Sequence, residues 1–314
     1  MKILVTGGSG LVGKAIQEVI SESQEKNNVF KFLSSKDCNL TIYDQVYKLF
    51  LDWTPDIVIH LACNVGGLFK NIEKKIEMFE DNLLINFNVL KCCRLFKVKK
   101  ILSCLSTCVF PDKITYPINE TMLHDGAPHS SNYGYAYVKR IIEIQTSLYA
   151  ESLDMEIVNL IPTNIYGKYD NFNLEESHVI PALIRKAYLS KTTGKKFIVK
   201  GSGKPVRQFL YSKDFAKIIL IFLEKKLESK FNNIIVTSKE EVSIKEVALK
   251  LVDIFKIDKN LLEFDEDYSD GQFKKTASNK KLMKIIPHFN FTNLCTGLVE
   301  TIFWFETCYP NVRL

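Results

Sequence analysis

Three glycines near the start of the chain limit its possible folds most strongly. They form the pattern Gly7-x-x-Gly10-x-x-Gly13, which follows the short apolar run Lys2-Ile3-Leu4-Val5-Thr6 and precedes a helical pattern over 11–20. Glycines let a backbone turn tightly and approach a pyrophosphate, which the free N–H groups of the following helix can bind. The order of strand, glycine turn and helix therefore predicts a dinucleotide-binding fold.

Strand-like and helix-like segments alternate after this turn. Apolar runs at 29–33, 57–62, 100–105 and 157–161 are separated by helical patterns at 44–51, 78–96 and 135–152. Such alternation is typical of a doubly wound parallel sheet with right-handed crossovers. We therefore predict an α/β protein whose first domain, of the Rossmann type, covers 1–165.

The alternation becomes less regular after residue 165. We predict helices at 179–189, 214–224, 242–255 and 292–305, and a strand at 197–200. The third of these helices opens with a capping box, in which Ser243 and Glu246 cap each other's backbone. We expect 166–314 to form mainly a smaller mixed α/β lobe for the substrate, while segments near 205–240 return to the first domain.

The residues after the second predicted strand bear on the identity of the dinucleotide. An Asp or Glu usually stands there in NAD-binding proteins and holds the ribose hydroxyls. This chain has Ser34-Ser35-Lys36-Asp37 instead. Hydroxyls and a lysine suit the 2′-phosphate of NADP(H), whereas Asp37 comes late for the ribose and is placed to hydrogen-bond the adenine. The sequence therefore favours NADP(H) over NAD.

Tyr135 and Lys139 carry the chemistry expected of such a protein, because a spacing of four puts them on one face of a helix. An ammonium beside a phenol favours phenolate and lowers its pKa, so Tyr135 could exchange a proton with a carbonyl during hydride transfer. Ser106 ends an apolar run and could hydrogen-bond the same carbonyl. Cys108 adds a candidate thiolate base, which indicates proton abstraction as well as reduction. Taken alone, the Tyr-x-x-x-Lys spacing fits a surface helix equally well.

Composition excludes several other classes. The 314 residues are 46% hydrophobic and 25% charged, as in an ordinary globular protein. No apolar stretch reaches the roughly 18 residues that span a bilayer, and the first strand runs into glycines instead of a signal-peptide cleavage site, so we expect a cytoplasmic protein. The eight cysteines include no CxxC pair, and we predict reduced thiols and no metal site. A net charge of +6 on dispersed lysines does not indicate nucleic-acid binding.

Longer motifs give a closer resemblance. With the glycine turn, Ser106 and the Tyr–Lys pair, the chain resembles the extended short-chain dehydrogenase/reductases, and in particular the branch that makes GDP-L-fucose. Seven longer motifs carry the resemblance to this branch. They are Asn64-Val65-Gly66-Gly67-Leu68, Ser106-Thr107-Cys108-Val109-Phe110-Pro111, Pro162-Thr163-Asn164-Ile165-Tyr166-Gly167, Asp170-Asn171-Phe172-Asn173, His178-Val179-Ile180-Pro181, Gly201-Ser202-Gly203-Lys204-Pro205-Val206-Arg207-Gln208-Phe209 and Asp270-Gly271-Gln272-Phe273-Lys274-Lys275.

The resemblance implies a bifunctional enzyme. It would epimerise GDP-4-keto-6-deoxy-D-mannose at positions 3 and 5 and then reduce the 4-keto group with NADPH. By resemblance, Tyr135 gives a proton to the keto oxygen with Ser106 as its hydrogen-bonding partner and Lys139 in support. Cys108 and His178 match the acid/base pair of the epimerisation.

The resemblance also implies which residues bind the two ligands. The positions that match the cofactor site are Gly7, Gly8, Ser9, Gly10, Leu11, Val12, Gly13, Ser34, Ser35, Lys36, Asp37, Leu105, Ser106, Lys139, Pro162, Thr163, Asn164, Ile165 and His178. The positions that match the GDP-sugar site are Lys186, Lys200, Arg207, Asp270 and Lys275. Two positions depart from the family pattern: some relatives have Trp where Lys200 stands, and Pro often stands where Lys168 follows Tyr-Gly.

Alternatives stay open at this point. Another nucleotide-sugar enzyme of the same fold, such as a 4-epimerase, would keep NAD bound and would be expected to carry an acid after the second strand. A non-catalytic dinucleotide-binding scaffold would not need Tyr135 or Lys139. The resemblance further implies a homodimer, in which the helices predicted at 78–96 and 135–152 form a four-helix interface.

Overall fold

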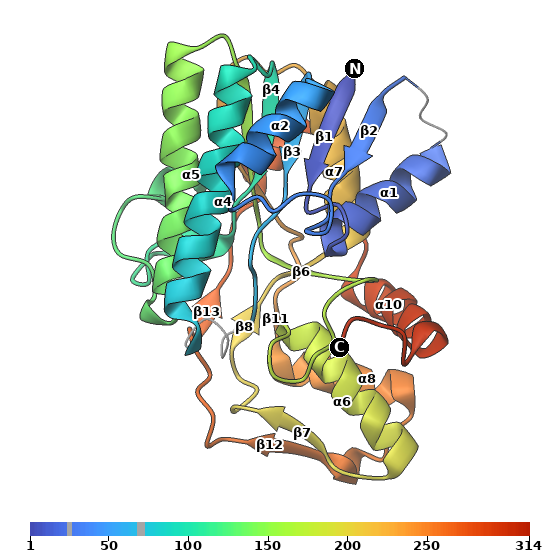
Figure 1. Cartoon of the computed structure of the whole chain (residues 1–314). Helices are drawn as coiled ribbons and strands as arrows, with labels where there is room; N and C mark the ends of the chain where they lie inside the picture. Colours follow the sequence, from blue (N-terminus) through green and yellow to red (C-terminus); the bar gives the residue numbers. More distant parts are fainter. Residues whose placement is uncertain (24–26, 68–72) are drawn as a thin grey trace.

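A six-stranded parallel sheet forms the upper half of the computed structural model, which describes residues 1–23, 27–67 and 73–314 (Figure 1). The strand order is β10-β5-β4-β3-β1-β2, and each neighbouring pair is parallel. The order reverses beside β1, and a ligand crevice forms at such a switch point outside the carboxyl ends of the strands. The strands are β1 (Lys2–Thr6), β2 (Val29–Phe32), β3 (Ile57–His60), β4 (Lys100–Cys104), β5 (Glu156–Pro162) and β10 (Phe231–Val236).

Helices cover both faces of this sheet, as a parallel sheet of mostly apolar strands requires. Successive side chains of β1 point to opposite faces, so Leu4 joins one core cluster while Ile3 and Val5 join another. The first face is covered by α2 (Tyr43–Trp53), α4 (Lys75–Leu95) and α5 (Tyr133–Ser152), and the second by α1 (Leu11–Ser23) and α7 (Ser212–Glu224) (Figure 1). The predicted doubly wound α/β fold is confirmed.

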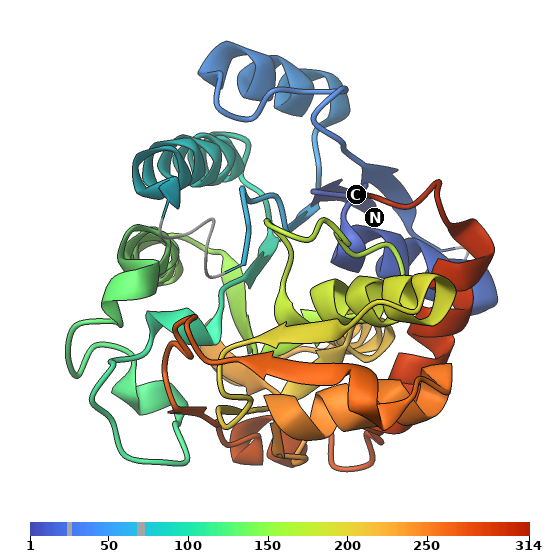
Figure 2. The same ribbon diagram turned by 90° about the horizontal axis from the view of Figure 1, so that it is seen from below.

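Most of the remaining elements form a smaller mixed lobe below the sheet (Figure 1; seen from below in Figure 2). This lobe has its own apolar core. Its helices α6 and α8 pack against each other, and its strands form short pairs and a three-stranded sheet in the order β11-β8-β13. The elements are β6 (Asn164–Tyr166), α6 (Val179–Thr193), β7 (Phe197–Lys200), β8 (Val206–Arg207), β9 (Phe209–Tyr211), β11 (Val242–Ser243), α8 (Ile244–Phe255), β12 (Leu262–Asp265), β13 (Lys274–Lys275) and α10 (Leu294–Cys308). Helix α9 (Lys280–Ile285) instead packs against β10 of the large sheet.

Several predicted helix boundaries differ by a few residues. The helix predicted over 292–305 runs from Leu294 to Cys308. The helix predicted over 242–255 begins at Ile244, because Val242 and Ser243 pair with β8 as strand β11. The predicted capping box is confirmed, since the Ser243 side chain accepts from the Glu246 N–H and the Glu246 side chain accepts from the Ser243 N–H. Leu68, the last residue of one family motif, lies outside the described residues. Among the described helices none combines the length and apolar character that crossing a membrane requires.

Candidate active site

A cavity of about 880 Å³ follows the carboxyl ends of β1, β3, β4 and β5. It is lined by most of the residues predicted to bind the cofactor. These are Gly7, Ser9, Gly10, Leu11, Val12, Gly13, Ser34, Ser35, Leu105, Ser106, Lys139, Pro162, Thr163, Asn164, Ile165 and His178. Gly8, Lys36 and Asp37 do not line it.

The glycine turn leaves no room for side chains. A Cβ on Gly7, whose φ is +71°, would lie 2.8 Å from the backbone nitrogen of Ala62, and one on Gly13 would lie 2.6 Å from the carbonyl oxygen of Gly7. Gly8 packs against β2, since its Cβ would be 2.7 Å from the Cβ of Phe32. At its glycines the turn therefore presents backbone to the cavity at the start of α1, and this arrangement fits the pyrophosphate of a dinucleotide.

The turn after β2 is held by Asp37. Its Oδ2 accepts hydrogen bonds from the Ser34 N–H at 2.7 Å and from the Ser34 hydroxyl at 2.6 Å. These bonds lower the pKa of Asp37 below its usual value. The carboxylate is therefore engaged within the turn, while Ser34 and Ser35 line the cavity. The adenine contact suggested for Asp37 stays a prediction.

Four of the five residues expected to carry the chemistry lie on α5 or on the turn after β4, and the fifth, His178, directly precedes α6. Ser106 caps a short 3-10 helix, Thr107–Val109, and its Oγ accepts a hydrogen bond from the Cys108 N–H at 3.3 Å. Lys139 is buried on α5, and its Nζ donates to the Cys104 carbonyl oxygen at 2.7 Å. The same Nζ is 5.7 Å from the centre of the Tyr135 ring. Helical spacing therefore places the ammonium near the phenol, as expected.

The predicted lowering of the Tyr135 pKa is wrong for this structure. Desolvation by burial raises the pKa well above its usual value, and the neighbouring Cys63, Cys108 and Cys104 raise it further. The Lys139 ammonium, 5.7 Å from the centre of the ring, does not outweigh these effects. Tyr135 is consequently a neutral phenol near neutral pH, which is the state that a proton donor needs.

Cys108 and His178 are both shifted by their surroundings. Burial raises the pKa of the Cys108 thiol, while the Lys275 charge, the hydrogen bond with Ser106 and the Lys139 charge act in the opposite direction. Desolvation lowers the pKa of His178, which precedes the first turn of α6. His178 is nevertheless exposed to both cavities, where a ligand can reach its ring.

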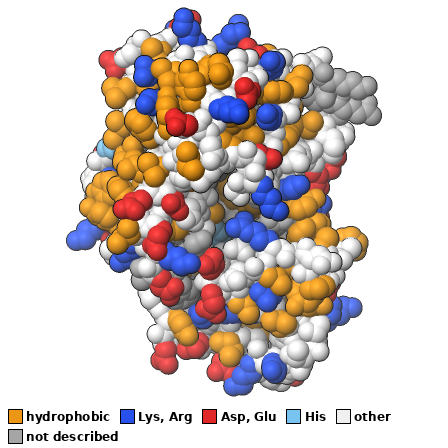
Figure 3. All heavy atoms as spheres, in the orientation of Figure 1, with side chains coloured by type: hydrophobic (Ala, Val, Ile, Leu, Met, Phe, Trp, Pro, Cys, Tyr) orange, Lys and Arg blue, Asp and Glu red, His pale blue; other side chains and the backbone are white. Residues whose placement is uncertain are grey.

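A second cavity, of about 310 Å³, opens on the side of the smaller lobe. It is lined by Ser106, Cys108, Tyr135, His178, Lys186, Lys200, Arg207, Asp270 and Lys275. The structure thus brings together all five predicted GDP-sugar residues and four of the five predicted catalytic residues. Ser106, Tyr135, His178 and Lys275 line both cavities. The middle of this face is hollowed, with basic side chains beside the hollow (Figure 3).

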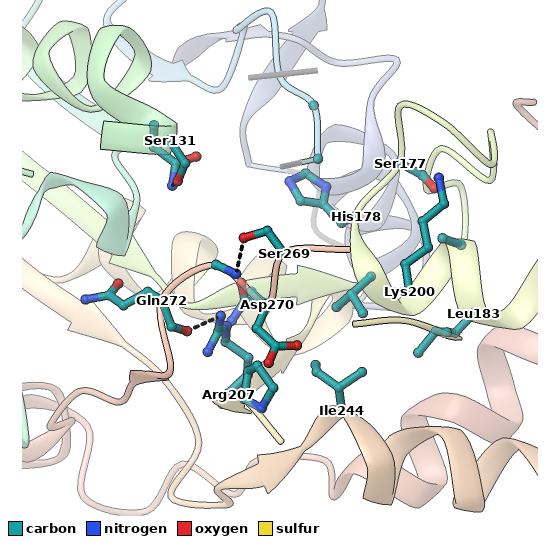
Figure 4. Close-up of a pocket in the computed structure, with 18 of the residues that line it drawn as sticks. Ser131, Ser177, His178, Leu183, Lys200, Arg207, Ile244, Ser269, Asp270 and Gln272 are labelled. Carbon is teal, nitrogen blue, oxygen red and sulfur yellow. Dashed lines mark hydrogen bonds between the residues drawn. The ribbon is translucent and has the colours of Figure 1, made fainter. Parts of the chain in front are cut away.

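Two polar clusters shape the second cavity (Figure 4). Arg207 donates from Nη2 to the Gln272 carbonyl oxygen at 2.6 Å, and burial lowers its pKa. Asp270 accepts from the Ser202 N–H at 2.8 Å and from the Ser202 hydroxyl at 2.6 Å. Lys275 lies directly beside Arg207 in the register of β13 with β8. Two cations side by side fit the phosphate groups of a nucleotide.

Lys186, on α6, and Lys200, at the end of β7, also line the second cavity. Lys186 donates to the Ile198 carbonyl oxygen at 3.1 Å. Lys200 lies 3.4 Å from a carboxylate oxygen of Glu175 and 4.6 Å from the centre of the Tyr268 ring. Where some relatives have an aromatic ring, this chain therefore offers a lysine that stacks on a tyrosine.

Sequence reasoning missed several residues of the site. The buried Asn82 side chain accepts from the Asn64 N–H at 2.7 Å and donates to the Asn64 carbonyl oxygen at 2.9 Å. These bonds fix the loop whose next residues, Val65 and Gly66, line both cavities. Cys63 donates to the same Asn82 oxygen at 3.0 Å. Asp170 and Arg313 line the cofactor cavity. A buried polar residue on a predicted helix face was the only available signal for Asn82.

Comparisons with known proteins agree with this geometry. Residues 3–236 match the model of the NAD dependent epimerase/dehydratase family. The chain therefore belongs to the NAD dependent epimerase/dehydratase family. No cluster of His, Cys, Asp and Glu suited to a metal ion occurs in the described part of the chain.

Within this family the similarity extends over nearly the whole chain. A GDP-L-fucose synthase from Dictyostelium discoideum is 45% identical, covering 99% of this chain and 97% of the relative. A probable GDP-L-fucose synthase from Drosophila melanogaster is 44% identical, covering 99% of each. The crystal structure of a GDP-L-fucose synthetase from Naegleria fowleri bound to NADP is 42% identical, with a TM-score of 0.91, covering 100% of this chain and 96% of that one. The resemblance seen in the motifs is confirmed.

Proposed function

We propose that this chain is a GDP-L-fucose synthase, which converts GDP-4-keto-6-deoxy-D-mannose to GDP-L-fucose by epimerisation at positions 3 and 5 and reduction at position 4. One observation carries the proposal. The cavity with the glycine turn and the cavity with the paired cations share Ser106, Tyr135 and His178. A dinucleotide and a nucleotide-sugar would therefore meet at these three side chains.

Epimerisation needs a base and an acid on opposite sides of an acidic carbon. Protons on the carbons beside a ketone are acidic, and hydrogen bonds from Ser106 and Tyr135 to the keto oxygen would stabilise the enolate. Cys108 accepts the proton from carbon, helped by the nearby positive charge of Lys275, which favours the thiolate. His178 then returns a proton to the other face.

Reduction follows at the same oxygen. NADP(H) fits the larger cavity and supplies, when bound, the hydride for the keto carbon. Tyr135, held neutral by burial, gives its proton to the oxygen that becomes a hydroxyl. Lys139 then stabilises the phenolate that is left, because its ammonium is 5.7 Å from the centre of the ring.

In this proposal each ligand is bound mainly by a different part of the chain. Residues 1–165 form the NADP(H)-binding domain, together with α7 and β10, which pack in the layers of the large sheet. Residues 166–314 mainly hold the GDP-sugar. Lys186, Lys200, Arg207, Asp270 and Lys275 come from this part and line the smaller cavity.

We also propose that the enzyme is a cytoplasmic homodimer. The neighbouring helices α4 and α5 expose large apolar side chains, among them Ile76, Leu84, Phe87, Ile144 and Leu148. Hydrophobic surface gathers over these helices on the left of Figure 3. Pairing with the same helices of a second copy would remove this surface from water. Light scattering of Ile144→Glu/Leu148→Glu should then show a monomer, whereas an unchanged mass would argue against this interface.

Turnover in deuterated water tests the reaction. Purified protein is mixed with GDP-4-keto-6-deoxy-D-mannose and NADPH, and nicotinamide absorbance and product mass are followed. We expect loss of NADPH and two carbon-bound solvent deuteriums in the GDP-fucose formed. Oxidation of NADPH without deuterium would leave a reductase only, and no turnover would point to another nucleotide-sugar.

A further inference from the structure

Asp170 is a buried carboxylate that the proposed reaction does not use. It is 5% exposed and lines the cofactor cavity. Its Oδ1 accepts a hydrogen bond from the Asn171 N–H at 2.7 Å, but its buried Oδ2 has no hydrogen-bond partner among the described residues. A buried carboxylate oxygen without a partner costs free energy, so its retention beside a ligand cavity points to a partner that engages it when a ligand binds.

Arg313 is the cation that faces this carboxylate. It follows α10, lines the same cavity and is exposed, and its positive charge acts on Asp170. Its guanidinium makes no hydrogen bond or ion pair with the described residues. A guanidinium offers five N–H donors in a planar fork, enough to bind a carboxylate on one edge and a phosphate on the other.

The backbone around both residues is firmly placed. The Phe172 N–H donates to the Arg313 carbonyl oxygen at 2.8 Å, which ties the segment after α10 to the loop that contains Asp170. The Phe172 ring packs on the Phe305 ring with 4.6 Å between centres, and Tyr169 packs on Trp304 at 4.8 Å. The backbone is therefore fixed while the Arg313 side chain stays unengaged.

The same loop is also tied to the helix that begins at the glycine turn. Lys168, two residues before Asp170, forms an ion pair with Glu18 of α1 at 2.9 Å. This pair ties the loop to the second half of α1, and the glycine turn at the start of α1 lines the same cavity as Asp170 and Arg313. In folds of this kind that helix start receives a pyrophosphate. The residues suited to a 2′-phosphate, Ser34 and Ser35, follow β2 instead.

We propose that Arg313 binds the pyrophosphate of NADP(H) and that the buried Asp170 positions its guanidinium. The proposal rests on the cofactor cavity and not on the identity of the sugar. Bound in this way, Arg313 gives Asp170 the partner that its Oδ2 lacks and neutralises phosphate charge opposite the glycine turn. Arg313 thereby extends the cofactor site to a segment far from the nucleotide-binding motifs in sequence.

Direct titration with NADPH, followed by its fluorescence, tests the proposal without any turnover. Arg313→Gln should raise the Kd for NADPH about ten-fold or more, since hydrogen bonds to charged groups contribute about 1.5–3 kcal/mol. Arg313→Lys should recover part of the loss because it keeps the charge but not the fork. Lys195→Gln, which removes an exposed lysine after α6, is the charge-matched control and should leave the Kd unchanged.

Two further arms separate the alternatives. Calorimetric titration with NADH should show the same fold-loss in Arg313→Gln as with NADPH, whereas a loss confined to NADPH would assign Arg313 to the 2′-phosphate and overturn the proposal. Asp170→Asn should weaken binding less than Arg313→Gln and should add nothing in the double variant, because Asp170 acts through Arg313. Unchanged binding in Arg313→Gln, with a native circular dichroism spectrum, would also refute it.

Discussion

The two cavities are built in different ways. The cofactor cavity lies at the ends of long parallel strands, and most of its lining comes within a few residues of a strand end. The substrate cavity is lined largely by turns and two-residue strands, such as β8 and β13, that are far apart in sequence. The cofactor cavity is therefore formed by the sheet itself, whereas the substrate cavity depends on how separate segments pack around that cavity. Variants should affect the two separately.

The largest expected effect is at the point where the cavities meet. Cys108→Ala removes the proposed base and should slow deuterium incorporation by about 10²–10⁴-fold. The Kd for NADPH should stay unchanged, because Cys108 lines only the substrate cavity. Product mass and a fluorescence titration measure the two quantities. Cys295→Ala, on the exposed side of α10, is the control, and equal effects of both variants would remove Cys108 from the mechanism.

A change in the glycine turn should damage the cofactor end together with the fold. In Gly13→Ala the new Cβ would lie 2.6 Å from backbone atoms of Gly7 and Gly8. We expect the free energy of unfolding to fall by at least about 2 kcal/mol and NADPH binding to be lost. Urea denaturation with and without NADPH measures both. The control is Gly126→Ala, whose Cβ would come no nearer than 3.4 Å to Pro111, and a similar loss there would contradict this account.

A change in the paired cations should affect only the substrate end. Arg207→Gln should raise KM for the GDP-sugar by about 10–100-fold through the loss of a charged hydrogen-bond donor. NADPH affinity should not change, since Arg207 does not line the larger cavity. Steady-state kinetics at saturating NADPH provide the measurement. A fall in kcat with KM unchanged would instead place Arg207 at the reacting atoms.

The smallest effect should appear in the pH dependence of stability. Burial raises the pKa of Asp170 to about 7 in the folded chain, with the Asn171 N–H and Arg313 opposing it. The unfolded chain has the ordinary pKa of about 3.9, so it loses its proton first and folding becomes less favourable as pH rises from about 4 to 7. Asp170→Asn removes this dependence, so its stability relative to the unsubstituted chain should rise with pH, by on the order of 1 kcal/mol per pH unit between about pH 4 and 7. Urea denaturation of both proteins at pH 5 and at pH 8 measures this. If their free energies of unfolding differed by the same amount at both pH values, the raised pKa of Asp170 would be contradicted.

Much of the cofactor end could be predicted from sequence, because the relevant signals are local. A glycine turn between a strand and a helix, and a Tyr–Lys pair one turn apart, fix neighbouring atoms by backbone geometry alone. The direction of the Tyr135 pKa could not be predicted, because it depends on burial among cysteines from three segments. The resemblance supplied Arg207 and Lys275, but only the register of β8 with β13 makes them neighbours. Asp170 and Arg313 carry no spacing that would connect them.

The side-by-side placement of Arg207 and Lys275 has a consequence for the empty enzyme. Their charges repel, and each lies in a partly desolvated position, so the Lys275 pKa is lowered by burial and by Arg207. The repulsion between these two cations therefore destabilises the folded lobe, and the negative charge of a bound diphosphate would remove this repulsion. GDP alone should consequently raise the melting temperature, with polyvalent inorganic anions having the same effect more weakly. In this sense the nucleotide completes the fold of the lobe that recognises it.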